Sequence, residues 1–388
     1  MKELLEAARA RCFFFGTGDA AQALCAANVP FGLAKIAWVQ RRLGFPGDAS
    51  FVAAPDTTVS RNVERWADGF GYGGVIRYTG DFVTLSIKSN LCGMLLVGLR
   101  EVPPAEEVLA RADRVKALRP ELDGIPVTWD LGSSNHFVSV LELDRPLEGF
   151  THAALLHGSG TEIRGEGPWG PGLYPADSPA LRRAMETHET PWGPLRILRG
   201  DAADGYRAGY AWIERFVHRR RELIAEALFP GCRVISNTTH QGSRDPGTYN
   251  LGCLQEAPGT LVPVALRAEL PIPLVRVLPN LGEDALRRAG VLERAEATGL
   301  RAHLGSVNLL PHGGGYAYPQ YRGVRRVLEL GDRRYFELEP AAGEHRELVH
   351  NLRGQPFTYR GEEVVRALEA YGMGEVVSRG TPVTVLMV

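Results

Sequence analysis

One cysteine and four histidines stand out in this chain of 388 residues, because they lie next to glycine or asparagine at the edges of apolar runs. They are Cys92, His136, His157, His240 and His312. A thiolate with several imidazoles is a borderline-soft ligand set, which suits manganese, zinc, iron or cobalt better than calcium or magnesium. Each residue alone also fits a structural role. Together they predict a site for a divalent transition metal.

His312 differs from the other histidines because three glycines come directly after it. The segment NLLPHGGGYAYP, residues 308–319, places Gly313, Gly314 and Gly315 next to the imidazole. Glycine tolerates unusual backbone angles and lets another group come close. We expect these glycines to leave room for a phosphate or a metal-bound ligand beside His312. The alternative is a glycine-rich turn that holds a structural histidine.

Short strands are expected to position these residues. Several apolar runs are bounded by glycine, aspartate or asparagine, which is typical of strands. They lie at residues 73–78, 82–87, 93–99, 136–143 and 154–159. Apolar residues that recur every three to four positions predict helices. These are expected at residues 104–117, 206–229, 283–299 and 361–371, with the clearest amphipathic pattern in the second.

The composition favours one large domain. The 45 glycines and 26 prolines are spread along the chain, and no strong linker divides it. We therefore predict an α+β fold in which residues 1–388 form a single large mixed-sheet domain with peripheral helices. The Gly/Pro-rich segment 158–205 is the loosest part. It is expected to form a loop that covers a site or connects elements on the surface.

Charge and hydropathy exclude several classes of protein. Hydrophobic residues make up 44% and charged residues 23%, as in ordinary soluble proteins. The net charge of −1 argues against a nonspecific coat for nucleic acid. The arginine-rich segments 218–221 and 325–334 are candidate basic patches, or simply solvated faces. No apolar run is long enough to span a membrane, no secretory signal is expected, and five cysteines favour a reducing cytoplasm.

Five segments occur in an order and spacing that resemble the RtcB-type RNA ligases. They are SNLCGM (89–94), GSSNHF (132–137), LLHGSG (155–160), THQGS (239–243) and HGGG (312–315). Further likenesses are DGFGYGGVI at 68–76, the helix around 210–224 and the closing segment 380–388. The resemblance covers roughly residues 50 to 320 and implies an RtcB-like fold.

The resemblance implies a metal-dependent RNA ligase with two Mn²⁺ ions, zinc or another divalent transition metal being the alternative. It further implies GTP as the nucleotide and His312 as the nucleophile that forms a histidine–GMP intermediate. GMP would pass to an RNA 3′-phosphate, the starting end being a 3′-phosphate or a 2′,3′-cyclic phosphate. A 5′-hydroxyl end would then join it, as in RNA repair and tRNA splicing.

Residue roles carry over segment by segment. Cys92 would bridge the metals, His157 and His240 would complete one metal site, and His136 with Asn90 would contribute to the other. Asn135 would orient a phosphate, and the glycines 313–315 would line the nucleotide site. These roles are implied by the resemblance.

Some positions depart from the family pattern. Asn90 stands where the family has an aspartate, Tyr316 replaces an arginine, and Met387 stands near the family's terminal lysine. The family has an acidic residue after Asn-His-Phe, where this chain has Val138 and Ser139. Arg244 and Arg322 are then the candidates to supply the missing positive charge. Two alternatives stay open: a metal-binding relative with other phosphoester chemistry, and a non-catalytic RNA-binding relative. The oligomeric state also stays open.

Overall fold

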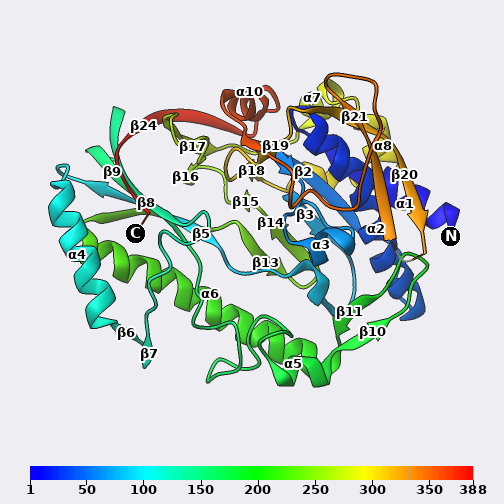
Figure 1. Cartoon of the computed structure of the whole chain (residues 1–388), viewed down its shortest axis with the longest axis horizontal. Coiled ribbons are helices and arrows are strands. Elements are labelled where there is room, and N and C mark those ends of the chain that lie inside the picture. Colours follow the sequence, from blue (N-terminus) through cyan, green and yellow to red (C-terminus); the bar gives the residue numbers. More distant parts are fainter. Residues whose placement is uncertain (332, 388) are drawn as a thin grey trace.

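The computed structural model describes residues 1–331 and 333–387, so Asp332 of the basic segment 325–334 and Val388 of the closing segment lie outside the described residues. The fold is mixed α/β with two large sheets and several small ones (Figure 1). The expected combination of helices with large sheets is confirmed. The strands are divided between these two large sheets and the small ones.

The larger sheet has seven antiparallel strands in the order β12-β5-β9-β8-β24-β17-β16. Their bounds are β12 Arg233–Thr239, β5 Gly93–Leu99, β9 Phe150–Gly158, β8 Phe137–Leu147, β24 Gly374–Leu386, β17 Ile272–Val277 and β16 Leu261–Pro263. Helices α4 (Ala105–Leu118) and α6 (Gly200–Leu228) pack on one face through a common apolar cluster, and a second cluster covers the other face. Strand β5 is therefore buried along its whole length, as its unbroken apolar sequence requires.

The second large sheet has the order β1-β2-β3-β14-β13, with β1 parallel to β2 and the other pairs antiparallel. Its strands are β1 Cys12–Phe14, β2 Ser50–Thr58, β3 Tyr72–Arg77, β14 Thr248–Leu251 and β13 Gln241–Asp245. Helices α1 (Lys2–Ala10) and α2 (Ala20–Arg42) share its apolar core. The turn from β12 into β13 connects the two large sheets, and His240 lies between them.

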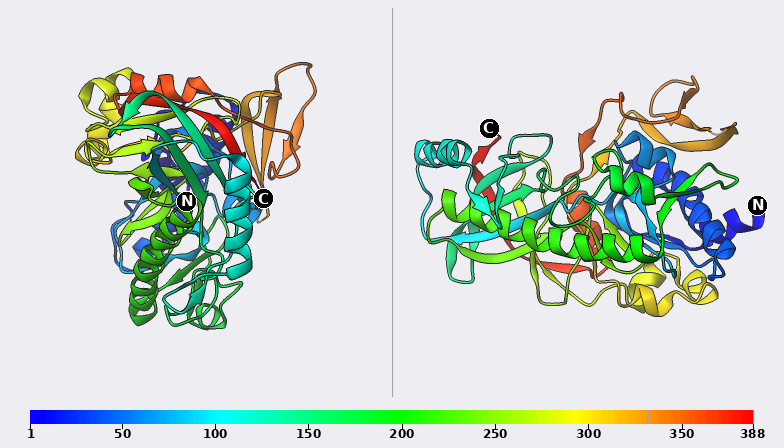
Figure 2. Two further views of the ribbon diagram at one scale, coloured as in Figure 1. Left: turned by 90° about the vertical axis from the view of Figure 1, so that its left-hand side faces the viewer. Right: turned by 90° about the horizontal axis from the view of Figure 1, so that it is seen from below.

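The remaining elements are short. The helices are α3 Val63–Ala67, α5 Pro179–Ala184, α7 Glu283–Arg288, α8 Leu292–Ala297, α9 Arg301–Leu304 and α10 Glu362–Ala370, with a 3-10 turn η1 at Leu85–Ile87. The strands are β4 Val83–Thr84, β6 Glu121–Leu122, β7 Ile125–Pro126, β10 Glu186–His188, β11 Leu195–Leu198, β15 Cys253–Gln255, β18 Leu309–Pro311, β19 Tyr316–Ala317, β20 Tyr321–Leu330, β21 Arg333–Pro340, β22 Glu347–Val349 and β23 Thr358–Tyr359. Strands β20, β21 and β22 form a sheet that projects from the body (orange in Figure 2).

Helix α6 confirms the clearest helix prediction, although it begins before residue 206. It runs along the long direction of the molecule (Figures 1 and 2). The interpretation of its arginine-rich segment as a basic patch or a solvated face is wrong for Arg220 and Arg221, which are 0% and 1% exposed. Both continue the buried stripe of Ile213, Phe216 and Val217, so helical spacing alone places them inward.

Other local expectations have mixed outcomes. The strands expected at 93–99, 136–143, 154–159 and 73–78 are found as β5, β8, β9 and β3, and helices α4 and α10 lie where expected. The run 82–87 is wrong as one strand, since only β4 forms before the chain turns into η1. The helix expected at 283–299 is divided into α7 and α8 at Gly290, whose φ is 65°.

The segment 158–205 is more ordered than the expected loop. It contains α5, β10 and β11, and its end forms the first residues of α6. Within the described part of the chain, no helix is long and apolar enough to cross a membrane.

Candidate metal centre

Cys92 lies in a tight turn immediately before β5. Lys88 and Leu91 adopt left-handed backbone angles, with φ of 55° and 58°. The side-chain oxygen of Asn90 accepts a hydrogen bond from the Cys92 backbone N–H at 3.0 Å. The backbone N–H of His240 in turn donates to the Cys92 carbonyl at 3.0 Å. The turn therefore fixes Cys92 and brings the β12–β13 connection against it.

His157 points toward Cys92 from the end of β9. Its Nδ1–H donates to the backbone carbonyl of Asn135 at 2.8 Å. A carbonyl only accepts, so the neutral imidazole carries its proton on Nδ1 and has a lone pair on Nε2. This Nε2 lies 3.2 Å from the Cys92 sulfur. The backbone before β8 thus sets the tautomer that a metal ligand requires.

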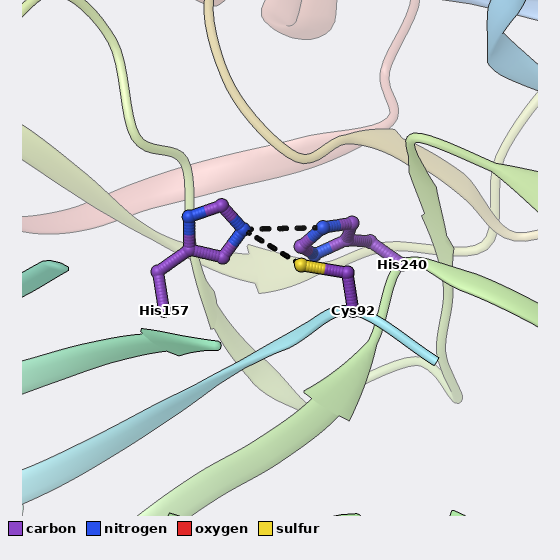
Figure 3. A group of neighbouring side chains, drawn as sticks. All are labelled: Cys92, His157 and His240. Carbon is purple, nitrogen blue, oxygen red and sulfur yellow. Dashed lines mark hydrogen bonds between the residues drawn. The ribbon is translucent and has the colours of Figure 1, made fainter. Parts of the chain in front are cut away.

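His240 completes a buried trio with Cys92 and His157 (Figure 3). The ligand atoms of the three residues all lie within 4.8 Å of one another. Nε2 of His240 lies 3.3 Å from Nε2 of His157. All three come from strand ends, as expected: Cys92 precedes β5, His157 is near the end of β9, and His240 follows β12.

The geometry of the trio fits a bound metal ion. Two nitrogens at roughly 2.0–2.1 Å from one tetrahedral ion lie about 3.3 Å apart, which is the separation found between His157 and His240. The two nitrogens are close enough to share one proton in a hydrogen bond, and a bound cation would take the place of that proton.

Electrostatics also favour metal binding. Burial raises the pKa of the Cys92 thiol, but His157 and the hydrogen bond with His136 lower that pKa well below its usual value. The thiolate, which is the form that binds metals, is therefore stabilised. Burial lowers the pKa of His240 to about 3, so its imidazole is neutral at physiological pH. Both groups are in the protonation state that a metal ligand needs.

His136 lies next to the trio rather than within it. Its Nε2 is 3.4 Å from the Cys92 sulfur, and its Nδ1 forms an ion pair with Asp130 at 2.9 Å. Burial opposes protonation, but Asp130 and Cys92 together raise the pKa of His136 to about 10. Asp130 is held in turn by Arg220 at 2.7 Å, which also contacts Glu162 at 2.9 Å. The sequence did not point to Asp130; its only signal was an aspartate close to a glycine-rich turn.

His312 lies at the other end of this row of imidazoles, with its ring centroid 4.5 Å from that of His240. Its Nδ1–H donates to the Asp56 carboxylate at 2.6 Å. The same carboxylate oxygen accepts the backbone N–H groups of His312 at 3.0 Å and Gly313 at 3.3 Å. In the neutral imidazole, Nε2 therefore has a free lone pair. Asp56 was not predicted as a site residue. The feature that could have indicated it is a carboxylate within the buried strand β2.

The three glycines after His312 are explained chiefly by the protein's own backbone. A Cβ at Gly313 would lie 2.4 Å from the Ala265 carbonyl oxygen, and one at Gly314 would lie 2.4 Å from that of Arg360. Gly315 has φ of 61°, and its Cβ would meet the Asp56 carbonyl. The glycines also line the cavity, so room for a ligand beside them stays a prediction. They allow three backbone segments to pack closely around His312.

A cavity of about 530 Å³ joins these groups. Its lining includes Asn90, Cys92, Asn135, His136, His157, His312 and the glycines 313–315. Its lining also includes cationic and aromatic side chains, those of Arg61, Arg65, Arg164, Arg267, Tyr316 and Tyr359. The paired strands β8 and β24 add an apolar wall with Phe137, Pro382 and Val385, and Leu270, Ile272 and Met387 are further apolar lining residues. The cavity thus presents charged, aromatic and apolar groups beside a candidate metal centre.

Several predicted residues have other contacts in the structure. Asn90 lines the cavity, but its side-chain oxygen already accepts the Cys92 N–H. The backbone carbonyl of Asn135 accepts the hydrogen bond from His157 Nδ1, and Asn135 also lines the cavity. Arg244 and Arg322 do not supply the missing charge. Arg244 pairs with Glu256 at 2.6 Å, and Arg322 donates to a carbonyl outside the cavity.

Comparison with known proteins leaves the family open. No protein-family model matches the chain. No curated protein matches it either. What the structure itself shows is that Cys92, His157 and His240 form a buried group able to hold a metal ion.

Proposed function

We propose that this chain is an RtcB-like, metal-dependent RNA ligase that works through a covalent histidine–nucleotide intermediate. One observation carries the proposal. His312 is fixed by Asp56 at Nδ1, and its ring lies 4.5 Å from that of His240 in the metal-ligand trio. An imidazole with one nitrogen held by a carboxylate and the other free is arranged as a nucleophile.

The proposed reaction has three steps. Nε2 of His312 attacks the α-phosphorus of a nucleoside triphosphate, so that an N–P bond forms, the P–O bond to the β-phosphate breaks and pyrophosphate leaves. An oxygen of an RNA 3′-phosphate then attacks the same phosphorus and displaces His312. Finally, an RNA 5′-hydroxyl attacks the activated 3′-phosphorus, loses its proton, forms the phosphodiester and releases the nucleoside monophosphate. A 2′,3′-cyclic phosphate would first be opened by water.

The residues present fit a divalent metal at the first of these steps. Cys92, His157 and His240 would hold it, and His136 is close enough to join on loss of its proton. When bound, manganese, zinc or a similar ion would offset phosphate charge during transfer. The chain's own contribution is to hold His312 with its Nε2 free and to keep the trio buried.

The nucleotide is GTP in the family that the sequence resembles, but the apolar part of this cavity favours a second possibility. Ser139 lies on β8 directly opposite Val385 of β24, and both line the cavity. Met387 continues this wall. A wall of this kind has no carboxylate or lysine to read the edge of guanine. A metal-dependent phosphoester reaction with another nucleotide is therefore the second candidate function.

Covalent labelling tests the proposal. The protein is incubated with Mn²⁺ and with GTP or ATP that carries radioactive phosphorus at the α position. We expect protein-bound label that survives alkali and is released by acid, as a phosphoramidate requires. His312→Gln should reduce the label at least about a thousandfold, because it removes the nucleophile. His345→Gln, a change at an exposed histidine, is the matched control and should retain it.

The outcomes separate the alternatives. If protein with bound metal takes up no label from either nucleotide, the ligase proposal is contradicted and other metal-dependent phosphoester chemistry becomes the better account. RNA binding without bound metal or label would favour the non-catalytic alternative.

A further inference from the structure

The cavity has a cation whose contacts are incomplete. Arg61 lies in the loop that connects β2 to α3, and it lines the cavity. Its Nη2 donates to the carbonyl of Arg353 at 3.2 Å. Its Nη1 is buried and has no hydrogen-bond partner among the residues that the structure describes. A buried guanidinium nitrogen without an acceptor is costly unless a ligand supplies one.

Aromatic side chains hold this guanidinium in place. Arg61 lies 4.3 Å from the ring centroid of Phe357 and 5.6 Å from that of Tyr316. The rings of Tyr316 and Tyr359 are 5.3 Å apart, and both tyrosines line the cavity. We call Arg61, Tyr316, Phe357 and Tyr359 the aromatic–arginine cluster. Tyr359 is 38% exposed, so part of the cluster is open to solvent.

The cluster is built on the same strand as the proposed nucleophile site. Asp56 of β2 holds His312, and two residues later Thr58 donates from Oγ1 to the Tyr316 carbonyl at 2.7 Å. The chain then continues to Arg61. Tyr316 follows His312 by four positions, across the closely packed glycines. One strand therefore positions both the imidazole and the cluster.

Two other arginines of the lining differ from Arg61 in their contacts, and the remaining one, Arg164, is exposed. Arg65 donates to the carbonyls of Ile87 and Lys88 at 2.7 and 2.6 Å. Arg267 pairs with Glu269 at 3.1 Å. These contacts satisfy or offset the positive charge of each residue. Arg61, which lies beside the rings of Phe357 and Tyr316 and whose Nη1 has no partner in the described part of the chain, is better placed than Arg65 and Arg267 to receive an anion.

We propose that the aromatic–arginine cluster binds the end of a single-stranded RNA, with Arg61 contacting its terminal 3′-phosphate and Tyr359 stacking on a nearby base. A cation next to partly open aromatic rings is the usual arrangement for binding single strands. Guanidinium pairs well with phosphate oxygens. The inference deepens the proposed function, on which it rests for the choice of RNA as the ligand. It also explains why Tyr316 is compatible with phosphate chemistry: its ring supports a guanidinium from another segment.

Direct binding tests the proposal without requiring catalysis. The full-length His312→Gln protein is titrated against a short fluorescent RNA that ends in either a 3′-phosphate or a 3′-hydroxyl, and anisotropy is recorded at fixed salt. We expect tighter binding of the 3′-phosphate RNA. In the same background, Arg61→Gln should weaken binding of this RNA about tenfold and remove the preference. Arg61→Lys, which keeps the charge, should restore part of it.

Two further variants define the contribution of each group. Arg322→Gln is the matched control, since it removes an exposed arginine that does not line the cavity, and it should change the affinity less than about threefold. Tyr359→Ala should weaken both RNAs about five- to tenfold, because stacking does not depend on the terminal phosphate. Circular dichroism of each variant checks that the fold is retained.

Other outcomes would overturn the inference. If Arg61→Gln leaves the preference for the 3′-phosphate intact, Arg61 does not bind that group. If it instead weakens only the binding of GTP or ATP, the cluster serves the nucleotide. Failure of the proposed function would be a separate result. If no covalent label forms on His312, the preference for the 3′-phosphate and its dependence on Arg61 can still be measured by binding.

Discussion

His136 and His312 lie at the two ends of a row of four imidazoles, and each contacts a buried aspartate, but the aspartates are held differently. Asp130 contacts His136 at 2.9 Å and also forms an ion pair with Arg220 at 2.7 Å. In the described part of the chain, the donors to the Asp56 carboxylate come from His312 and Gly313. The first arrangement is a balanced charge network that fixes a group beside the candidate metal-binding trio. The second orients one imidazole and leaves its other nitrogen free.

The two aspartate arrangements are also expected to affect different properties, one the stability of the fold and the other the reaction of His312. The network at His136 reaches helix α6 and contains the buried Glu162 side chain, so it connects the site to the scaffold. The Asp56 arrangement depends on the backbone of residues 312–313 and reaches no such network through the carboxylate contacts described. Changes at the first should therefore affect folding and metal binding, and changes at the second should affect the reaction of His312.

The largest effect is expected from Arg220→Met. The change leaves the buried Glu162 without its cation and leaves Asp130 with His136 as its remaining cation. Breaking a buried network of this kind costs about 3–5 kcal/mol. The free energy of unfolding, measured by urea denaturation, should fall by that amount. The neighbouring Arg219→Met is the matched control, because Arg219 pairs with Asp123 on the surface and should cost less than about 1 kcal/mol. Equal losses in the two variants would show that the buried network does not stabilise the fold.

A smaller but more specific effect is expected from Asp56→Asn. Asparagine can still accept the His312 Nδ1–H, so the geometry is retained while the charge is removed. Covalent labelling of His312 should slow about 10- to 100-fold, as is usual when a partner that orients a reactive imidazole is changed. Metal content should stay the same, since Asp56 does not belong to the metal-ligand trio.

Asp130→Asn should give the reverse pattern and sharpen the comparison. It removes the partner of His136 beside Cys92, so metal affinity should fall more than the labelling rate of protein that is saturated with metal. If the two aspartate variants behave alike, the distinction drawn between the two ends of the row is wrong.

The sequence allowed the ligand side chains to be predicted but not the groups that hold them. Cys92, His157 and His240 were recognisable because a thiol and imidazoles at strand ends are uncommon and chemically specific. Asp56 has no local partner: its contact with His312 joins positions 256 residues apart. A lone carboxylate in an apolar run gives no sign of the group it will meet.

Two other differences between the sequence-based predictions and the structure have physical causes that the sequence reveals only in part. Arg220 and Arg221 continue the buried stripe of α6 at helical spacing, but their charge favoured a surface interpretation. Their burial depends on carboxylates and carbonyls from distant segments. The glycines 313–315 were correctly identified as a place of close approach. That the approaching groups include Ala265, Arg360 and Asp56 backbone could be known only from the tertiary structure.

The central claim is that Cys92, His157 and His240 hold a divalent metal, and metal content tests it most directly. The purified protein and Cys92→Ala are loaded separately with Mn²⁺ and Zn²⁺, freed of excess ion and analysed by mass spectrometry of the elements. Cys232→Ala, a change at a cysteine that belongs neither to the trio nor to the cavity lining, serves as the control. We predict at least one ion per chain in the wild type and the control, and a loss of about tenfold or more in metal affinity for Cys92→Ala. Wild-type protein that retains neither ion, or a Cys92→Ala variant that binds as tightly as the wild type, would contradict the account.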